Sequence, residues 1–188
     1  MSVLEAIYAR RAIREYTPER VARDDLQALL RAAVQAPSAM NGQPWIFAVI
    51  EDRARLARWS ELAKAMVLRD LERQSDPKAT RYQATLRRAD YDVFHGAPAL
   101  VVIGASERGR YAEADGWLAA QNLMLAACDA GLGTCPIGFA VPLLNTPEIK
   151  AEMGFPPAAI AVAPIVLGHP ASTPAAVARF EPRVLAWM

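Results

Sequence analysis

The segment over residues 99–104, Ala-Leu-Val-Val-Ile-Gly, restricts the possible folds of this chain more than any other feature of its sequence. It contains no polar side chain, and Pro98 and Gly104 bound it. An unbroken apolar run of this kind is typical of a strand that is covered on both faces. The sequence therefore predicts a central buried strand, with other elements packed on each side of it.

A long apolar segment over residues 112–130 follows this strand and predicts a helix. Its apolar residues lie almost all round the helix, which is typical of a core helix rather than a surface helix. Gly131 comes next and can adopt the left-handed conformation that ends many helices. We expect this helix to lie at the centre of the core.

Two further helices are expected before the first strand. Ser2 and Glu5 have the spacing of a capping box and predict a helix over residues 3–10. A second helix is expected to stop at Pro37, because proline cannot donate a hydrogen bond to the preceding turn. The apolar residues at helical spacing that indicate it are Leu26, Leu29, Leu30 and Ala33.

The remaining elements alternate between strands and helices. A strand is expected at residues 45–50, and Thr146 with Pro147 begins a short helix that stops at Gly154. A final strand is expected at residues 159–167, with Pro164 at an edge or a bulge because proline cannot donate to a ladder. The residues Leu56, Trp59, Leu62, Ala63 and Met66 repeat at helical spacing after the first strand.

Helices thus outnumber strands, and the strands are spread along the chain, which indicates an α+β layer arrangement. The 188 residues suit one domain, and no repeat or linker divides them, so we expect a single domain over residues 1–188.

Two regions lack a core pattern. Residues 68–92 are the most polar part of the chain and are expected either as a mobile helical segment or lid over a cleft, or as a plain solvated helix. The last twenty residues are too rich in proline for regular structure, yet they end in Val184, Leu185 and Trp187. A partner subunit is the expected cover for that apolar surface.

The composition excludes several classes of function. Because 21 basic residues are balanced by 20 acidic ones, no global field attracts nucleic acid or an anionic membrane. No run reaches the roughly 20 apolar residues that span a bilayer, and Glu5 lies where a signal peptide would have its apolar core. We therefore expect a cytoplasmic protein with small-molecule partners.

Metal binding is not expected either. The chain has two histidines, His95 and His169, and no cluster of acidic ligands. Its two cysteines, Cys128 and Cys135, have the spacing of neither a CxxC pair nor a zinc half-site. Both are expected to be buried free thiols.

Two early segments together indicate a flavin site. Arg10, Arg11 and Arg14 offer permanent positive charge for a phosphate, and residues 36–45 offer a loop of small and amide side chains against which a flat ligand can lie. Arg10 and Arg14 would share one face if the first helix continued through them. The alternative is a solvated basic face, balanced by Glu5, Glu15 and Glu19.

Four separated segments make the whole chain resemble the FMN-dependent nitroreductase family. They are RRAIREY at residues 10–16, APSAMNGQPW at 36–45, AACDAGLGTCPIG at 126–138, and the end of the chain, with LGHP at 167–170 followed by Pro174, Arg179 and PRVLAW. The resemblance implies a nitroreductase-like fold, with a central, mostly antiparallel sheet flanked by helices. It also implies an interlocked homodimer that binds one FMN in each of two sites at the subunit interface.

The resemblance assigns roles to individual residues. Arg10 and Arg179 are expected to bind the phosphate, Arg11 to line the phosphate and ribityl region, and Arg14 to face the ribityl chain and the pyrimidine edge. Arg183 is the alternative to Arg179. Ala12 stands where family members commonly have serine, so only its backbone amide can serve the cofactor. The cation that many members add after the first strand has no clear match, with Lys64 the available residue.

The ring itself is expected between two chains. Pro37, Ser38, Ala39 and Asn41 of the other subunit form the wall and donors over it, and Gln43 at least braces their loop. On the opposite face, the resemblance places Pro136, Ile137 and Gly138, with backbone amides near the flavin N5.

The implied activity is that of an NAD(P)H oxidoreductase, in which NADH or NADPH delivers hydride to the flavin N5, leaves, and is replaced by an acceptor. One shared pocket predicts ping-pong kinetics and broad, planar acceptors such as nitroaromatics or quinones. The alternatives are a non-catalytic flavin carrier or redox sensor, and another flavin reaction such as dehalogenation or dehydrogenation. A hydrolase is disfavoured because Ser106 lacks the glycine two residues later that a nucleophile elbow requires, and no GxGxxG motif indicates a Rossmann dehydrogenase.

Overall fold

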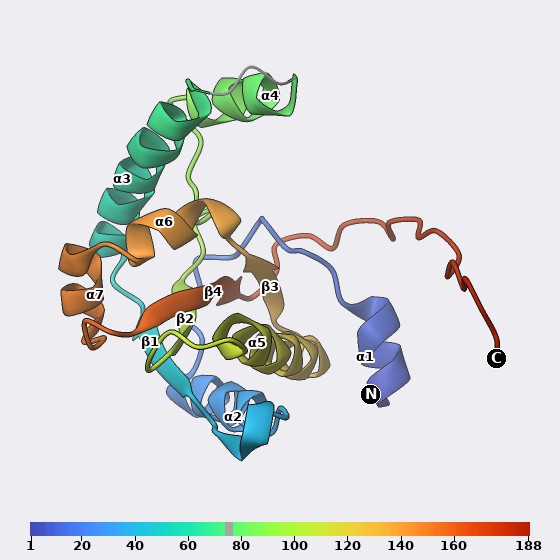
Figure 1. Cartoon of the computed structure of the whole chain (residues 1–188). Helices are drawn as coiled ribbons and strands as arrows, with labels where there is room; N and C mark the ends of the chain where they lie inside the picture. Colours follow the sequence, from blue (N-terminus) through green and yellow to red (C-terminus); the bar gives the residue numbers. More distant parts are fainter. Residues whose placement is uncertain (74–76) are drawn as a thin grey trace.

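The computed structural model describes residues 1–73 and 77–188, and a four-stranded antiparallel sheet lies at the centre of this part of the chain (Figure 1). The strand order is β1-β2-β4-β3. The strands are β1 (Trp45–Ile50), β2 (Ala99–Ala105), β3 (Gly133–Pro136) and β4 (Ile160–Gly168). The α+β class with an antiparallel sheet is therefore confirmed.

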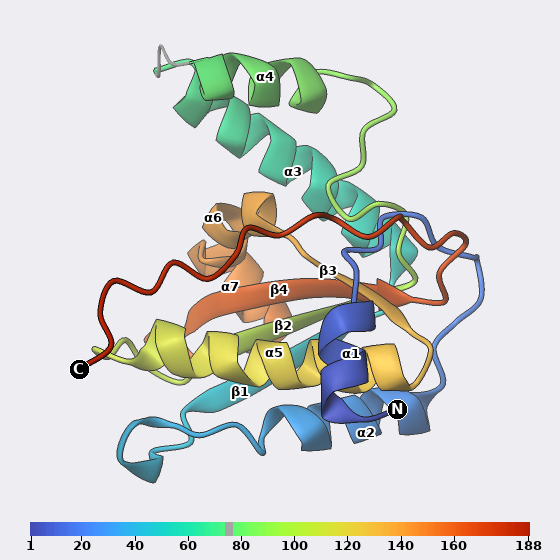
Figure 2. The same cartoon turned by 90° about the vertical axis from the view of Figure 1, so that its right-hand side faces the viewer.

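Helices cover both faces of this sheet. One face carries α2 and α5, with α1 packed across α5 (Figure 2), and the other carries α3, α6 and α7. The α-helices are α1 (Val3–Ala9), α2 (Arg23–Ala33), α3 (Arg53–Leu71), α4 (Pro77–Leu86), α5 (Ala112–Asp129), α6 (Val141–Leu144) and α7 (Pro147–Met153). Two short 3-10 helices, η1 (Ala39–Asn41) and η2 (Gly138–Ala140), complete the described elements.

The strand β2 lies at the centre of the core, as its sequence predicts. All seven of its residues are buried. Leu100 and Val102 point into the cluster formed with α3 and α6, whereas Val101 and Ile103 point into the cluster formed with α2 and α5. Side chains alternate between the two faces of a strand, so a run without polar residues is what two covered faces require.

Most expected element boundaries agree with the structure. The capping box of α1 is present, with the Glu5 amide 3.2 Å from the Ser2 hydroxyl, and Gly131 follows α5 in the left-handed conformation at φ 74°. The second helix ends at Ala33, before the expected stop at Pro37. The strand β3 was not expected, because four residues with a glycine and a proline carry too little pattern to indicate it.

Pro164 does not lie in an edge strand, since β4 pairs with β2 on one side and with β3 on the other. A bulge does occur in β4, but at Val162, where the pairing with β2 shifts. The Pro164 carbonyl accepts a hydrogen bond from the amide of Ile137, just beyond the end of β3. In a strand, the nitrogen and the carbonyl of one residue point to the same side. The nitrogen of Pro164 therefore points toward β3 and away from β2, so its missing N–H removes no hydrogen bond between β4 and β2.

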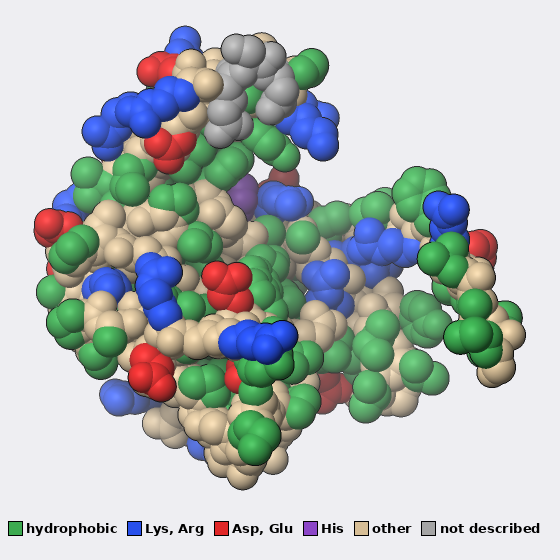
Figure 3. Space-filling view, in the orientation of Figure 1, with side chains coloured by type: hydrophobic (Ala, Val, Ile, Leu, Met, Phe, Trp, Pro, Cys, Tyr) green, Lys and Arg blue, Asp and Glu red, His purple; other side chains and the backbone are tan. Residues whose placement is uncertain are grey.

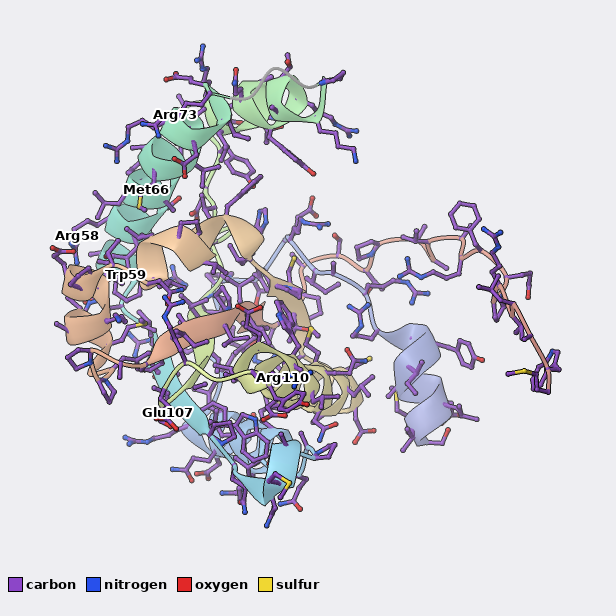
Figure 4. The ribbon with its side chains drawn as sticks, viewed as in Figure 1. Arg58, Trp59, Met66, Arg73, Glu107 and Arg110 are labelled. Atoms are coloured by element: carbon purple, nitrogen blue, oxygen red, sulfur yellow. The ribbon has the colours of Figure 1, made fainter. Side chains whose placement is uncertain are left out.

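The polar region over residues 68–92 contains the end of α3 and the whole of α4, while residues 72–73 and 87–92 lie outside both helices. Residues 74–76 of that prediction lie outside the described residues. The helices α3 and α4 form an arm above the sheet (Figure 1). The side chains of Ala79 and Leu86, on α4, are buried. The base of the arm is held by Trp59, whose indole nitrogen lies 3.2 Å from Glu152 of α7, and by an Arg58–Glu152 ion pair (Figure 4).

Both ends of the chain expose apolar side chains. The tail after Gly168 has no helix or strand and extends away from the sheet (Figure 1), with Phe180 and Trp187 fully or almost fully exposed. Val3, Leu4 and Tyr8 are exposed on α1.

The central helix α5 is not buried on all sides, because Trp117 and Leu118 are 43% and 45% exposed.

Candidate functional site

The segment with the first arginines is extended rather than helical. The helix α1 ends at Ala9, so the condition under which Arg10 and Arg14 would share a helix face, that the helix continues through them, is not met. The segment runs beside β3 instead, where Ala12 bridges to Thr134 and the Ile13 amide donates to the Thr134 carbonyl at 3.0 Å.

This segment approaches β3 closely because Gly133 has no side chain. A Cβ at Gly133 would lie 2.7 Å from the nearest side-chain atom of Ile13, which is itself buried. Further along, the Tyr16 hydroxyl donates to the Ile13 carbonyl at 2.7 Å, and burial raises the pKa of this phenol. Packing and hydrogen bonds together fix the position of the arginine segment on the sheet.

A cavity of about 340 Å³ opens where this segment, β3 and η2 meet. Its floor is the chain from Cys135 to Phe139, which includes the expected residues Pro136, Ile137 and Gly138, and Arg14 lies at its edge. Tyr82 of α4 lines the side toward the arm. Figure 3 shows the hollow between the arm and the body of the molecule, with a histidine and a basic side chain at its base.

Charge in this cavity is positive. Burial raises the pKa of the Cys135 thiol and outweighs the opposing effect of Arg14, so the sulfur stays protonated near neutral pH. Burial and the Arg14 charge both lower the pKa of His95, which keeps this imidazole neutral. Cys135 is buried as expected, whereas Cys128 is only half-buried, and both are free.

Arg10 and Arg11 line a neighbouring, smaller hollow with Gly131 and Thr134. One terminal nitrogen of Arg11 donates to the carbonyls of Tyr8, Ala9 and Arg10, at 2.6, 3.0 and 3.0 Å. Arg11 therefore caps the C-terminal end of α1, where carbonyls lack partners within the helix. Its Nε is buried and has no partner among the described residues.

The loop with the other expected residues lies elsewhere. In Figures 1 and 2 the turn that follows α2 is on the opposite side of the sheet from the β3–η2 floor. Pro37, Ser38, Ala39 and Asn41 are therefore not brought to Arg14 within one chain. Three residues of this loop that are not glycine, Met40, Asn41 and Gln43, have left-handed φ values of 50°, 53° and 45°.

Two side chains hold this loop. The Ser38 hydroxyl accepts from the Gln43 amide at 3.0 Å, and the buried Asp115 carboxylate of α5 accepts from the Ala39 amide at 3.1 Å. The Gln43 side chain donates to that of Asn41 at 3.3 Å, as bracing requires. Sequence reasoning missed Asp115, because the first turn of α5 contains two acids, Glu113 and Asp115, and no local pattern distinguishes the one that holds the loop.

Arg179 and Arg183 lie in the exposed tail, and neither lines the cavity that contains Arg14 or the smaller hollow that contains Arg10. Lys64 is buried on α3, where it pairs with Glu61 at 2.9 Å. No described helix is both long enough and apolar enough to cross a membrane, and the described residues contain no cluster of three or more potential metal ligands.

Comparison with known proteins identifies several similar chains. A nitroreductase with bound FMN from Bacteroides fragilis NCTC 9343 is 26% identical, with a TM-score of 0.82 over 100% of this chain and 98% of that one. The FMN reductase [NAD(P)H] of Bacillus subtilis strain 168 is 29% identical over 90% of this chain and 66% of its own length. The iodotyrosine deiodinase of Thermotoga neapolitana is 28% identical over 78% and 82%.

The model of one protein family matches residues 7–169, a range that begins just before the arginine segment and ends after β4. The antiparallel sheet, the position of the arginine segment beside β3 and the match over most of the sequence all support the same family assignment. This chain belongs to the nitroreductase family.

Proposed function

We propose that this protein is an FMN-dependent oxidoreductase, which takes electrons from NADH or NADPH and reduces planar acceptors such as nitroaromatics or quinones. The observation that carries the proposal is the cavity with Pro136, Ile137 and Gly138 as its floor and Arg14 at its edge. It combines a flat apolar surface with permanent positive charge, which is what a planar anionic cofactor needs.

The residues of the cavity fit FMN. A Cβ at Gly138 would meet no atom within 4 Å, so the space above this residue is open to a ring. Gly138 and Phe139 begin η2, and the first amides of a helix lack partners within it. Open space, free amides and an arginine suit a flat ring whose edge gains negative charge on reduction.

FMN, when bound, would supply two-electron chemistry at its isoalloxazine ring. The chain would bind and orient it. Arg14 would attract the ribityl and pyrimidine side, Arg10 and a tail arginine the phosphate, and the β3–η2 floor would exclude water from one face. Over a full turnover with a nitroaromatic, NAD(P)H and a proton supply two electrons and two protons, and the nitro group becomes a nitroso group with release of water.

We further propose that the protein works as a homodimer with two sites at the subunit interface. The loop with Ser38 and Asn41 cannot reach the cavity of its own chain, so the partner's copy would complete the site. Apolar side chains on α1, on α5 and in the tail are exposed and available for such an interface, among them Tyr8, Trp117 and Trp187.

Absorbance of the purified protein tests the cofactor. We expect the visible bands of oxidised flavin, FMN as the extracted compound, anaerobic bleaching by NADH or NADPH, and parallel lines in double-reciprocal plots. An unchanged spectrum with both donors would favour a flavin carrier. Colourless protein that does not take up added FMN would contradict the proposal.

A substitution at Gly138 tests the position of the ring. Gly138→Val should leave the melting temperature unchanged, because nothing lies near the new side chain, but should weaken FMN binding about tenfold by filling the space above the floor. Gly109→Val adds a side chain to another open position outside the cavity and should leave FMN binding unchanged. Equal FMN affinity in both variants would show that the ring does not lie above Gly138.

The deiodinase relative supports one alternative within the same chemistry, which is reductive dehalogenation. Release of iodide from 3-iodotyrosine by the reduced protein, at a rate above that of nitroaromatic reduction, would favour it.

A further inference from the structure

His95 lines two adjoining spaces, the cavity over the β3–η2 floor and a larger hollow of about 560 Å³ that α4 also lines. The other titratable side chains of these linings are Arg14, Tyr82, Tyr91 and Cys135 in the cavity, and Lys78 and Arg81 in the hollow. Among the described lining residues, only the histidine is of a type that ordinarily titrates between pH 5 and 8. The cavity thus contains one side chain that is suited to give and take a proton near neutral pH.

The backbone around His95 is held in an uncommon conformation. His95 and Gly96 both have left-handed φ values, 57° and 64°, which are uncommon for residues other than glycine. The Asp92 carboxylate holds this turn, since it accepts from the amides of Phe94 and Gly96 at 2.9 and 2.7 Å. The buried Phe94 side chain anchors the chain directly before His95. Such backbone conformations persist where the surroundings fix them, and they cluster at functional sites.

The groups around the His95 ring act on its charge in opposite directions. Burial and the Arg14 charge lower the pKa of His95, whereas the Asp92 carboxylate of the same turn raises it. The lowering effects prevail, so the protonated ring is a stronger acid than an ordinary imidazolium. Tyr91 meets the ring edge to face at 5.9 Å between centroids, and burial raises the pKa of this phenol, which therefore keeps its proton. His95 is the better proton donor of the two.

The proposed reaction needs a proton donor. A nitro group takes up a hydride, which carries two electrons and one proton, and one further proton to give a nitroso group and water. A quinone likewise takes up a hydride and one further proton to give a hydroquinone. An acid beside the acceptor lowers the barrier, because it supplies this proton while the acceptor oxygen gains negative charge.

We propose that His95 is the general acid of the reaction and donates this proton to the acceptor oxygen. The inference rests on the proposed function, since it assigns the proton donor of that same site. The N–H bond of the imidazolium breaks as the new O–H bond forms, and the neutral ring that remains takes its next proton from water. Water can reach the ring because His95 is half-buried rather than enclosed.

Contact with the acceptor can be measured without turnover. The chain has two histidines, so His95→Asn and His169→Asn assign the ring signals in NMR spectra of the untagged, oxidised holoenzyme. Adding 4-nitrobenzamide, which the oxidised protein cannot reduce, should shift the ring signals of His95. Those of His169 should stay unchanged, because this residue does not line the cavity and lies 3.9 Å from Glu19. An unshifted His95 ring, when the flavin spectrum shows that the ligand is bound, would overturn the proposal.

His95→Asn is the matched variant for the reaction itself, because asparagine tolerates a left-handed φ and remains polar but has no acidic proton. Reoxidation of the reduced holoenzyme by 4-nitrobenzamide should be about a hundredfold slower at pH 6. FMN affinity, the melting temperature and reduction by NADH or NADPH should stay near those of the parent protein. His169→Asn is the control and should change neither half-reaction. Equal slowing of both half-reactions by His95→Asn would show that His95 only shapes the site, and would overturn the proposal.

The pH dependence separates proton donation from shape. In the parent protein, the rate of reoxidation should fall as the pH rises through the pKa of His95, which lies below its ordinary value of 6.5, because only the protonated ring donates. This step should be absent from the profile of His95→Asn. A variant that keeps the same step would assign the proton to another group and contradict the inference.

Chemical rescue is the final test. His95→Gly removes the ring and suits the left-handed backbone. Added imidazole should restore part of the reoxidation rate, in proportion to the concentration of its protonated form. Intact FMN binding and intact bleaching by NADH or NADPH, without rescue, would refute the inference alone. Failure to bind FMN in the parent protein would refute the proposed function and this inference with it.

Discussion

The two halves of the candidate site are held in different ways. The β3–η2 floor and the arginine segment are part of the sheet, where backbone pairing and the contact of Gly133 with Ile13 fix them. The loop after α2 has no strand partner, and side-chain hydrogen bonds from Ser38 and Asp115 hold it in a conformation with positive φ values. The floor therefore depends on packing, and the loop depends on a few polar contacts that single substitutions can remove.

The largest effect is expected at the floor. Gly133→Val would place side-chain atoms within 3 Å of Ile13, and overpacking of this kind costs about 3 kcal/mol. In a chain of this length the melting temperature should fall by roughly 6 to 12 °C. Gly109→Val, at an open position, is the control in the same calorimetric scan. Equal melting temperatures for both variants would show that the arginine segment is not packed on β3.

A smaller loss is expected at the base of the loop. Asp115→Ala leaves the Ala39 amide without its acceptor and should destabilise the protein by about 2 kcal/mol in urea unfolding. Glu113→Ala removes an exposed acid from the same helical turn and should cost only a few tenths of this. If the loop covers the cofactor, Asp115→Ala should also weaken FMN binding, and Glu113→Ala should not.

Ser38→Ala should cost about 1 kcal/mol, because it removes a single neutral hydrogen bond to the Gln43 amide. Ser38→Thr keeps the hydroxyl and should retain most of the stability. Proteolysis within the loop is a sensitive measurement, since local opening exposes it first. Equal cleavage rates in the two variants would indicate that this hydroxyl does not hold the loop.

The smallest effect concerns the titration of His95. Its pKa is lowered by burial and by Arg14, so the folded protein binds fewer protons than the unfolded chain below the ordinary histidine range. This contribution to stability is complete above about pH 6.5 and is lost as the pH falls below it. Arg14→Gln should raise the pKa of His95, as followed by its ring resonances in NMR, whereas Arg87→Gln should not. A fall in that pKa would contradict the proximity of Arg14.

The contrast between the two halves also explains how far the sequence could predict this molecule. The buried strand β2, the helix α5 with Gly131, and the capped helices α1 and α7 follow from local patterns, and these predictions are confirmed. The strand β3 and the true position of Pro164 depend on partners far away in the sequence. No local pattern contains that information. The pairing of β4 with β3 ends at Ile165, next to Pro164, so the missing N–H of this proline is tolerated because of where a distant strand ends.

For the site, residue types were easier to predict than contacts. Arg14 and the segment from Pro136 to Gly138 do meet in one cavity. Arg11, however, caps α1, a contact that depends on the helix ending at Ala9 rather than continuing. Asp115 was missed because its bond to Ala39 joins residues 76 positions apart. The roles of Arg10, Arg179 and the loop residues toward a cofactor stay predictions.

Mixing two defective variants tests the central claim, that the floor of one subunit and the loop of its partner form one FMN site. Arg14→Glu reverses the charge beside the floor, and Ala39→Trp places a large side chain on the loop, so neither variant alone should bind FMN. Co-expression should restore FMN at one per mixed dimer, because one of its two sites combines an intact floor with an intact loop. FMN that stays absent from the isolated mixed dimer would contradict a site shared between subunits.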